Sequence, residues 1–223
     1  MRFTSALSIY TAASAAVACL ATQPMPERRC DVAWTLYGST LYVMGGFHDP
    51  NSDSGFDVHV AHPSNYAIDF GTDASTVGDW QILAEMPDVR ATGHVVAYDD
   101  VVYYIGGSDT DLQVHDTVFK YHISNNSYTS GTSLPVARDR GQARIVTFPQ
   151  NSTTGIVGPA MVVVGGTDAS RIALTSIVAF PLECSDNCQW VDLTNLTIGR
   201  RSFEMEVINN KLYIFGGVTG AGS

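Results

Sequence analysis

The sequence has few cysteines, few tryptophans and few basic residues. Its 223 residues include four cysteines, three tryptophans and only twelve lysines and arginines, against 22 acidic residues. A net charge of −10 repels phosphate backbones, so we do not expect nucleic-acid binding. Beyond the N-terminus no run approaches the ~20 apolar residues of a membrane span. We find no heptads or low-complexity tracts, and the 45% hydrophobic content is that of a folded, core-forming domain.

The first residues have the pattern of a secretory signal peptide. Arg2 supplies a positive charge, Ala6–Leu20 is apolar and rich in alanine, and Cys19–Ala21 offers small residues for cleavage. The pattern predicts a signal peptide over residues 1–21 and a secreted, extracellular protein. A lipid-attachment site at Ala16–Cys19 is the alternative.

Three Asn-x-Ser/Thr triplets match the acceptor pattern for N-glycosylation, which is found on surface loops of secreted proteins. The acceptors are Asn125, Asn151 and Asn195. Together with the leader, they predict a glycoprotein of a eukaryotic secretory route.

Removal of the leader leaves three cysteines. Cys184 and Cys188 are spaced C-x3-C beside Trp190, and we predict a local disulfide in an oxidising compartment. Cys30 is then left over, and we expect its partner in sequence beyond the present C-terminus.

A repeat dominates the rest of the chain. Four strand-forming apolar runs each end in a glycine pair, and the pairs recur about every 50 to 60 residues. The pairs are Gly45–Gly46, Gly106–Gly107, Gly165–Gly166 and Gly216–Gly217. Before each later pair come an arginine, an apolar run and a polar hairpin turn such as Asp99–Asp100 or Asn209–Asn210. After it come a third strand and a fourth that carries an aromatic residue, as at Trp80 and Trp190.

This pattern resembles the kelch repeat, whose family forms β-propellers of four-stranded blades. The resemblance covers residues 30–217 and implies an all-β, kelch-type β-propeller of four-stranded antiparallel blades. The implied blades are 32–88, 89–135, 136–196 and a partial 197–217, followed by a truncated end at 218–223. Tyr128 departs from the pattern, because it replaces the tryptophan of the second unit.

The strand count gives three complete blades and half of a fourth. Such a set does not close a ring, and an open edge strand invites unwanted pairing. We expect that the sequence is truncated; the alternative is that another chain completes the propeller.

Five of the twelve basic residues recur at one place in the repeat: Arg90, Arg138, Arg140, Arg200 and Arg201. On a propeller they would form an arc around the mouth of the central channel. Guanidinium groups bind carboxylates bidentately, so the arc would suit acidic peptides or sugar acids. In kelch relatives matching arginines either contact acidic ligands or tie neighbouring blades through backbone carbonyls, and both roles stay open here.

The loop after the first glycine pair is a candidate calcium site. Its oxygen-bearing residues are Asp49, Asn51, Asp53 and Asp57, spaced like the D-x-[DN]-x-[DN] loops that bind this cation. Val60 stands where an EF-hand has its bidentate glutamate, and a solvated acidic loop is the alternative. We expect no other cofactor.

The leading functional hypothesis is a secreted, non-catalytic propeller that binds a protein or glycan through the arginine-bearing face. One alternative is a fragment of a carbohydrate-active enzyme, either a galactose-oxidase-like copper oxidase or a sugar-acid epimerase. The oxidase chemistry needs a cysteine cross-linked to a tyrosine, and no such constellation can be read in the sequence. Another alternative is a structural subunit of an extracellular assembly.

Overall fold

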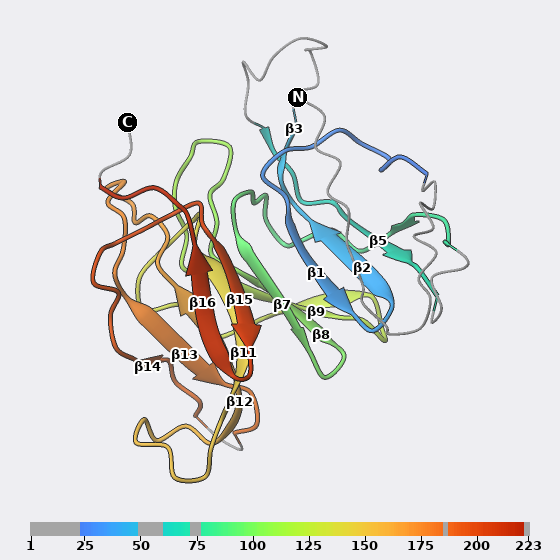
Figure 1. Cartoon of the computed structure of the whole chain (residues 1–223). Coiled ribbons are helices and arrows are strands. Elements are labelled where there is room, and N and C mark those ends of the chain that lie inside the picture. Colours follow the sequence, from blue (N-terminus) through green and yellow to red (C-terminus); the bar gives the residue numbers. More distant parts are fainter. Residues whose placement is uncertain (1–22, 49–59, 72–76, 185–186, 221–223) are drawn as a thin grey trace, which may run out of the picture.

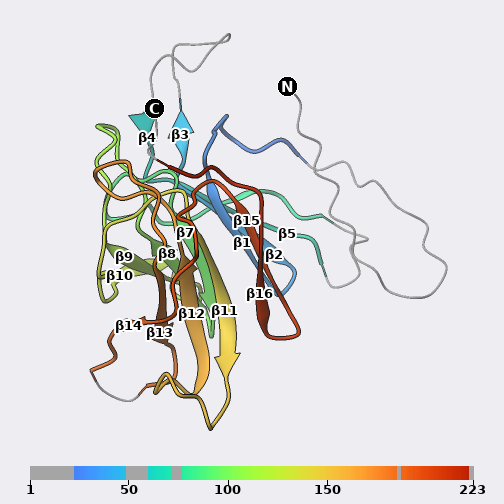
Figure 2. The same ribbon diagram turned by 60° about the vertical axis from the view of Figure 1, so that its left-hand side comes forward.

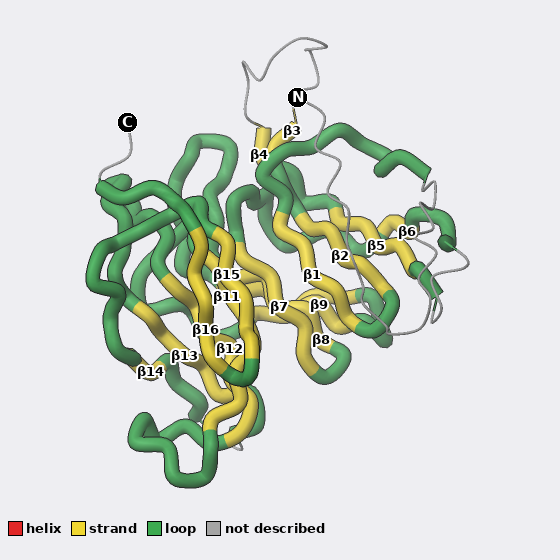
Figure 3. The backbone as a smooth tube through the Cα atoms, viewed as in Figure 1, coloured by secondary structure: helices red, strands yellow, loops and turns green. Residues whose placement is uncertain are grey.

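The computed structural model describes residues 23–48, 60–71, 77–184 and 187–220, and it is an all-β structure with no helix in these ranges (Figure 3). The signal-peptide prediction for residues 1–21 lies outside the described residues. The all-β prediction is confirmed.

The strands form three four-stranded antiparallel sheets and two two-stranded ones (Figure 1). The first sheet is β1 (Ala33–Tyr37), β2 (Thr40–Met44), β5 (Asn65–Asp69) and β6 (Gln81–Ile82). The second is β7 (His94–Tyr98), β8 (Val101–Ile105), β9 (Val118–His122) and β10 (Ser127–Ser130). The third is β11 (Gln142–Phe148), β12 (Gly158–Val164), β13 (Ile177–Pro181) and β14 (Val191–Asp192). The fourth sheet is β15 (Glu204–Ile208) and β16 (Lys211–Phe215), and a small ribbon pairs β3 (Phe47–His48) with β4 (Val60–Ala61).

Within each sheet the strand order follows the chain, and every pair is antiparallel. The first strands of successive sheets lie side by side, β1 with β7, β7 with β11 and β11 with β15. The β3–β4 ribbon projects at one end of the molecule, and the β11–β12 connection lies at the other (Figures 1 and 2).

The turns between the first and second strands of the second and fourth sheets are polar hairpin turns, as predicted. Asp99 and Asp100 have φ of 45° and 64°, and Asn209 and Asn210 have φ of 50° and 58°. Positive φ at both central residues is the mark of a type I′ turn, whose twist matches that of the flanking strands. Asp and Asn tolerate this conformation better than most residues.

The core lies between the sheets. Along the second strand of each sheet, successive side chains point alternately toward the preceding sheet and the following sheet. The residues one and three places before a glycine pair face the following sheet, as Met44 and Tyr42 do when they pack with Val102 and Tyr104 of β8. The residues two and four places before a pair face the preceding sheet. Three such clusters follow one another along the chain.

The glycine pairs receive the backbone of the following unit. Gly45, Gly106 and Gly165 have φ of 59°, 65° and 55°, and a Cβ on them would lie 2.3, 2.3 and 2.5 Å from a carbonyl oxygen. These carbonyls belong to Arg90, Arg138 and Arg200, and each also accepts a 2.9 Å hydrogen bond from the second glycine of the pair. The doublet therefore marks close approach of two backbones, which only glycine allows.

A series of backbone hydrogen bonds, here called the inter-sheet belt, links the units two residues before each first strand. It joins Asp31, Thr92, Arg140 and Ser202, all with φ between 51° and 56°. Each N–H donates to the carbonyl of the preceding member, at 3.0, 2.9 and 2.7 Å. Four non-glycine residues thus share the left-handed conformation at one repeat position, where it directs the main chain toward its neighbour.

We expect Gly106→Ala to destabilise the protein more than Gly155→Ala. Both glycines have positive φ, but a Cβ at Gly155 has open space, so its substitution costs about 1–2 kcal/mol for the backbone alone. Gly106→Ala should cost roughly 1–3 kcal/mol more, because the Arg138 carbonyl must move. Denaturant unfolding of both variants measures the difference, and equal losses would contradict the close-approach role.

Candidate binding face

Four arginines occupy the place four residues before the first strand of each sheet: Arg29, Arg90, Arg138 and Arg200. The main chains of the last three bond to the preceding unit, as when Arg138 N–H donates to the His115 carbonyl at 3.1 Å. The guanidinium of Arg138 donates to the Gly165 carbonyl and to Ser176 Oγ, both at 3.1 Å. It therefore ties the second sheet to the third.

Two of the other arginines, Arg29 and Arg200, make related contacts. Arg29 donates to the carbonyls of Gly45 at 3.0 Å and Ser64 at 2.7 Å, and Arg200 donates to the Gly216 carbonyl. Arg90 departs from the pattern. It pairs with Asp88 at 2.8 Å, donates to Thr117 Oγ1 at 3.2 Å and lies over the Phe119 ring.

These contacts enclose three of the guanidinium groups. The side chains of Arg29 and Arg90 are 1% and 2% exposed, and Arg138 is fully buried. Burial lowers the pKa of Arg138 to about 10. The structure thus places Arg90 and Arg138, two residues of the predicted ligand-binding arc, between the sheets. Arg29 was not predicted from the sequence, although its spacing from β1 matches that of the others.

A second group of arginines lies at the surface and converges on one buried carboxylate. Arg140 Nη1 is 3.0 Å and Arg171 Nη1 is 3.6 Å from Asp139 Oδ2. Asp139 is fully buried, whereas the side chains of Arg140 and Arg171 are 29% and 34% exposed. Burial raises the pKa of Asp139, and the two guanidinium groups oppose that rise.

Two hydroxyls complete what we call the Asp139 cluster: Thr92, Ser108, Asp139, Arg140 and Arg171. Thr92 Oγ1 lies 2.8 Å from Ser108 Oγ and 3.5 Å from Asp139 Oδ2. The other carboxylate oxygen, Oδ1, is buried and has no hydrogen-bond partner in the described parts of the chain. The cluster thus draws residues from the linkers and post-glycine loops of two successive units.

The backbone places Arg201 close to this cluster, because Ser202 N–H donates to the Arg140 carbonyl at 2.7 Å through the inter-sheet belt. Arg201 has the repeat position of Asp139, since each pairs with the residue that follows a glycine pair, and its Nε is buried without a hydrogen-bond partner among the described residues. The repeated arginine position predicted Arg140 and Arg201 as candidate binding residues. Arg171 was not predicted, because it has no repeated counterpart in the sequence.

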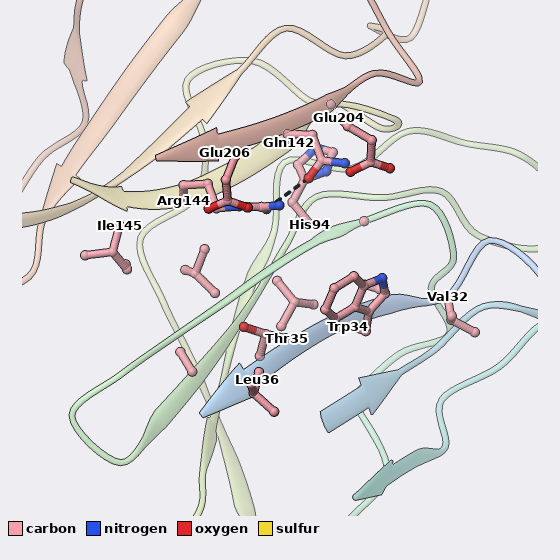
Figure 4. A pocket seen from close by; sticks show the side chains of 16 residues that line it. Val32, Trp34, Thr35, Leu36, His94, Gln142, Arg144, Ile145, Glu204 and Glu206 are labelled. Carbon is pink, nitrogen blue, oxygen red and sulfur yellow. Dashed lines mark hydrogen bonds and ion pairs between the residues drawn. The ribbon is translucent and has the colours of Figure 1, made fainter. Parts of the chain in front are cut away.

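The four first strands line a cavity of about 490 Å³ (Figure 4). Trp34 and Leu36 of β1 are 55% and 45% exposed. Across from β1, Arg144 donates to Gln142 Oε1 at 3.1 Å and its Nε lies 3.6 Å from Glu206 Oε2. These polar groups come from β11 and β15.

His94, on β7, is a buried polar residue in the cavity lining. It is 4% exposed, and its Nε2 has no hydrogen-bond partner among the described residues. Burial, with a smaller contribution from Arg138, lowers its pKa to about 3. The imidazole is therefore neutral at physiological pH.

The indole N–H of each fourth-strand tryptophan has a hydrogen-bond partner, as an N–H buried among apolar groups requires. Trp80 Nε1 donates to the Gln23 carbonyl at 2.9 Å, and Trp190 Nε1 donates to the Thr132 carbonyl at 3.0 Å. Tyr128, which replaces the tryptophan of the second unit, packs against Tyr121 with ring centroids 5.2 Å apart.

The structure also places the remaining predicted sites. Asn125, Asn151 and Asn195 are all exposed on connections between strands. Cys184 and Cys188 form a disulfide, and Cys30 is the free cysteine of the described residues. The calcium candidates Asp49, Asn51, Asp53 and Asp57 lie outside the described residues, so that site stays a prediction. Within the described ranges no three His, Cys, Asp or Glu residues gather as metal ligands.

Comparison with known proteins gives one informative relative. Alpha-scruin of Limulus polyphemus, a kelch-repeat protein, is 26% identical over 201 residues, which is 86% of this chain. The chain spans about a fifth (19%) of the length of that relative. No family model matches. The likeness suggests a kelch-like family, at low identity. In the ranges that the structure describes, no helix is long and apolar enough to cross a membrane.

We expect His94→Gln to reduce the loss of stability between pH 7 and pH 5. The pKa of His94 rises on unfolding from about 3 to about 6.5, so below pH 6.5 the unfolded chain binds a proton that the folded protein does not. Stability then falls by up to about 1.4 kcal/mol per pH unit as pH falls toward 3. Asp139, with its raised pKa, acts in the opposite direction in both proteins.

Urea unfolding of wild type and variant at pH 7 and pH 5 tests this. The wild type should lose about 2 kcal/mol more than the variant over this interval. If the two proteins show the same pH slope, His94 is not the buried neutral group that we describe.

Proposed function

We propose that the sheets fan about a common axis as part of a kelch-type β-propeller, and that the protein is a secreted, protein-binding module. The side-by-side first strands and the inter-sheet belt support the radial arrangement. The likeness to alpha-scruin supports the kelch-type assignment. A further chain that completes the ring belongs to the same proposal.

The proposed binding face carries Arg140, Arg171 and Arg201 beside the post-glycine loops. The observation that carries the proposal is the convergence of Arg140 and Arg171 on Asp139. This buried carboxylate holds the two guanidinium groups in place, while about a third of each side chain stays open to solvent. Its single negative charge offsets one of the two cations, so the cluster keeps a positive charge with free N–H donors.

The chemistry of the cluster favours an acidic segment of a partner protein. Guanidinium N–H groups form short, charge-assisted hydrogen bonds with carboxylates, and two fixed guanidinium groups lower the entropy cost of binding. The chain as a whole carries a charge of −10, so anions are attracted only where arginines gather. A sugar acid in a glycan presents the same carboxylate to the same groups.

In this proposal the predicted arginine arc divides into two roles. Arg90, Arg138 and Arg200 donate within the protein to Thr117 Oγ1 and to the carbonyls of Gly165 and Gly216. Arg140 and Arg201 keep the ligand-binding role, and Arg171 joins them. The exposed Asn125, Asn151 and Asn195, together with the disulfide, support the secreted and glycosylated part of the proposal.

Fluorescence anisotropy with a labelled glutamate-rich peptide tests the binding face, with a glutamine-rich peptide of equal length as the neutral probe. We expect the wild type to bind the acidic peptide, and the Arg140→Ala/Arg171→Ala variant to bind it about tenfold or more weakly, because charge-assisted bonds are lost. Binding should also weaken as salt rises.

Two control variants separate binding from folding. Arg144→Ala removes a cation from the central cavity and should leave peptide affinity unchanged. Arg138→Ala should lower the melting temperature without changing affinity, because its guanidinium bonds only within the protein. Equal binding of both peptides, or an unchanged affinity in the double variant, would refute the proposed face.

A further inference from the structure

Asp139 is a buried carboxylate, and both of its ion-pair partners in the described chain are arginines of the proposed binding face. Arg140 Nη1 and Arg171 Nη1 approach the same oxygen, Oδ2, while their side chains stay partly open to solvent. The other oxygen, Oδ1, accepts no hydrogen bond from any described residue. The negative charge of Asp139 is therefore balanced by two guanidinium groups that a ligand can also reach.

The backbone and the loops hold these three charged groups together. Asp139 N–H donates to the Thr167 carbonyl at 3.0 Å, and Thr167 N–H donates to the Asp139 carbonyl at 2.8 Å. Arg171 is fixed by a second contact, because its Nη2 donates to the Leu112 carbonyl at 2.7 Å. A ligand carboxylate that binds the two guanidinium groups therefore comes close to the carboxylate of Asp139.

An anionic ligand changes the charge balance of the Asp139 cluster. Without a ligand one carboxylate shares two guanidinium groups, and with a ligand two carboxylates compete for the same donors. A nearby like charge disfavours the ionised form of a carboxyl group, and a buried charge that loses its partners is neutralised by a proton. Oδ1 can accept this proton without losing a hydrogen bond, since it has none in the described chain.

Of the described titratable groups that face Asp139, none of the others can take up this proton. The guanidinium groups of Arg140 and Arg171 are already charged. Burial raises the pKa of the Tyr104 phenol, which therefore stays neutral. Burial also raises the pKa of Asp139, against the opposing effect of the two arginines. The carboxyl group of Asp139 is thus the proton acceptor of the cluster.

We propose that binding of an anionic segment at Arg140 and Arg171 is coupled to the uptake of a proton by Asp139. The ligand anion replaces the Asp139 carboxylate as the partner of the guanidinium groups, and Asp139 becomes a neutral acid. Because the bound state holds one more proton, affinity rises as pH falls, by at most about tenfold per pH unit. The inference rests on the proposed function and adds the regulation of the same site.

Fluorescence anisotropy at pH 7.5 and pH 5.5 tests the coupling. The probe is a labelled cysteate-rich peptide, whose sulfonate groups stay ionised at both values. The wild type should bind it roughly threefold or more tightly at pH 5.5 than at pH 7.5. Asp139→Asn removes the charge but keeps an oxygen that can accept from the guanidinium groups, so this variant should bind at least as tightly as the wild type and lose the difference between the two pH values.

Glu206→Gln is the matched control. It removes one negative charge from an exposed ion pair with Arg144, outside the cluster, and should keep the pH dependence of the wild type. Weaker binding by Asp139→Asn at both pH values would show that Asp139 serves only to position the arginines, and would overturn the proposal. So would a wild type with equal affinity at both values, or the same loss of pH dependence in Glu206→Gln.

Isothermal titration calorimetry of the wild type measures the proton directly and does not depend on the folding of a variant. Titration of the cysteate peptide at pH 6.5 in two buffers of different ionisation enthalpy gives the number of protons exchanged. We expect net uptake of up to about one proton per peptide bound, and no uptake or net release would refute the coupling.

The outcomes separate the coupling from the proposed function. If the cysteate peptide binds through Arg140 and Arg171 without proton uptake, only the coupling fails and the binding face stands. If neither the cysteate peptide nor the glutamate-rich peptide binds at either pH, the proposed function fails, and the coupling fails with it.

Discussion

Each junction between neighbouring sheets depends on a main-chain carbonyl that lies where no side chain would fit. The carbonyl of Arg138 approaches Gly106 so closely that a Cβ would be 2.3 Å away, and the same contact recurs at Gly45 and Gly165. Two backbones can approach in this way only at glycine, and the second glycine of the pair donates a hydrogen bond to the same carbonyl. The register of each unit against the next follows from this contact, and so does the overlap of their apolar faces.

The same junction divides the arginines into two kinds. Arg138 and Arg140 are two residues apart, yet the first is fully buried and the second reaches the surface. The left-handed φ of 51° at Arg140 turns the main chain between them. A buried guanidinium is stable here because carbonyl and hydroxyl oxygens accept its hydrogen bonds, which offsets part of the desolvation cost. The exposed one is held by Asp139, whose burial is supported by two neighbouring cations.

Much of the fold could be predicted from the sequence, and less of the site. The glycine pairs, the Asp-Asp and Asn-Asn turns and the fourth-strand tryptophans each reflect a local constraint, and the structure has the strands where these residues predict them. The arginine spacing marked a real repeat position, but it did not distinguish Arg138 from Arg140. Asp139 and Arg171 were missed, because they meet only when loops of two successive units come together.

The sequence by itself determined the strands, their order and the side of each strand that is apolar, because these depend on backbone conformation and alternation within a few residues. Only the tertiary structure decided which side chains are buried. Trp34 and Val95 occupy the same repeat position, yet one is exposed and the other packs against a neighbouring sheet. The physical reason is that a side chain on these faces is buried only where a neighbouring unit covers it. Its burial therefore depends on what lies opposite it as much as on the residue itself.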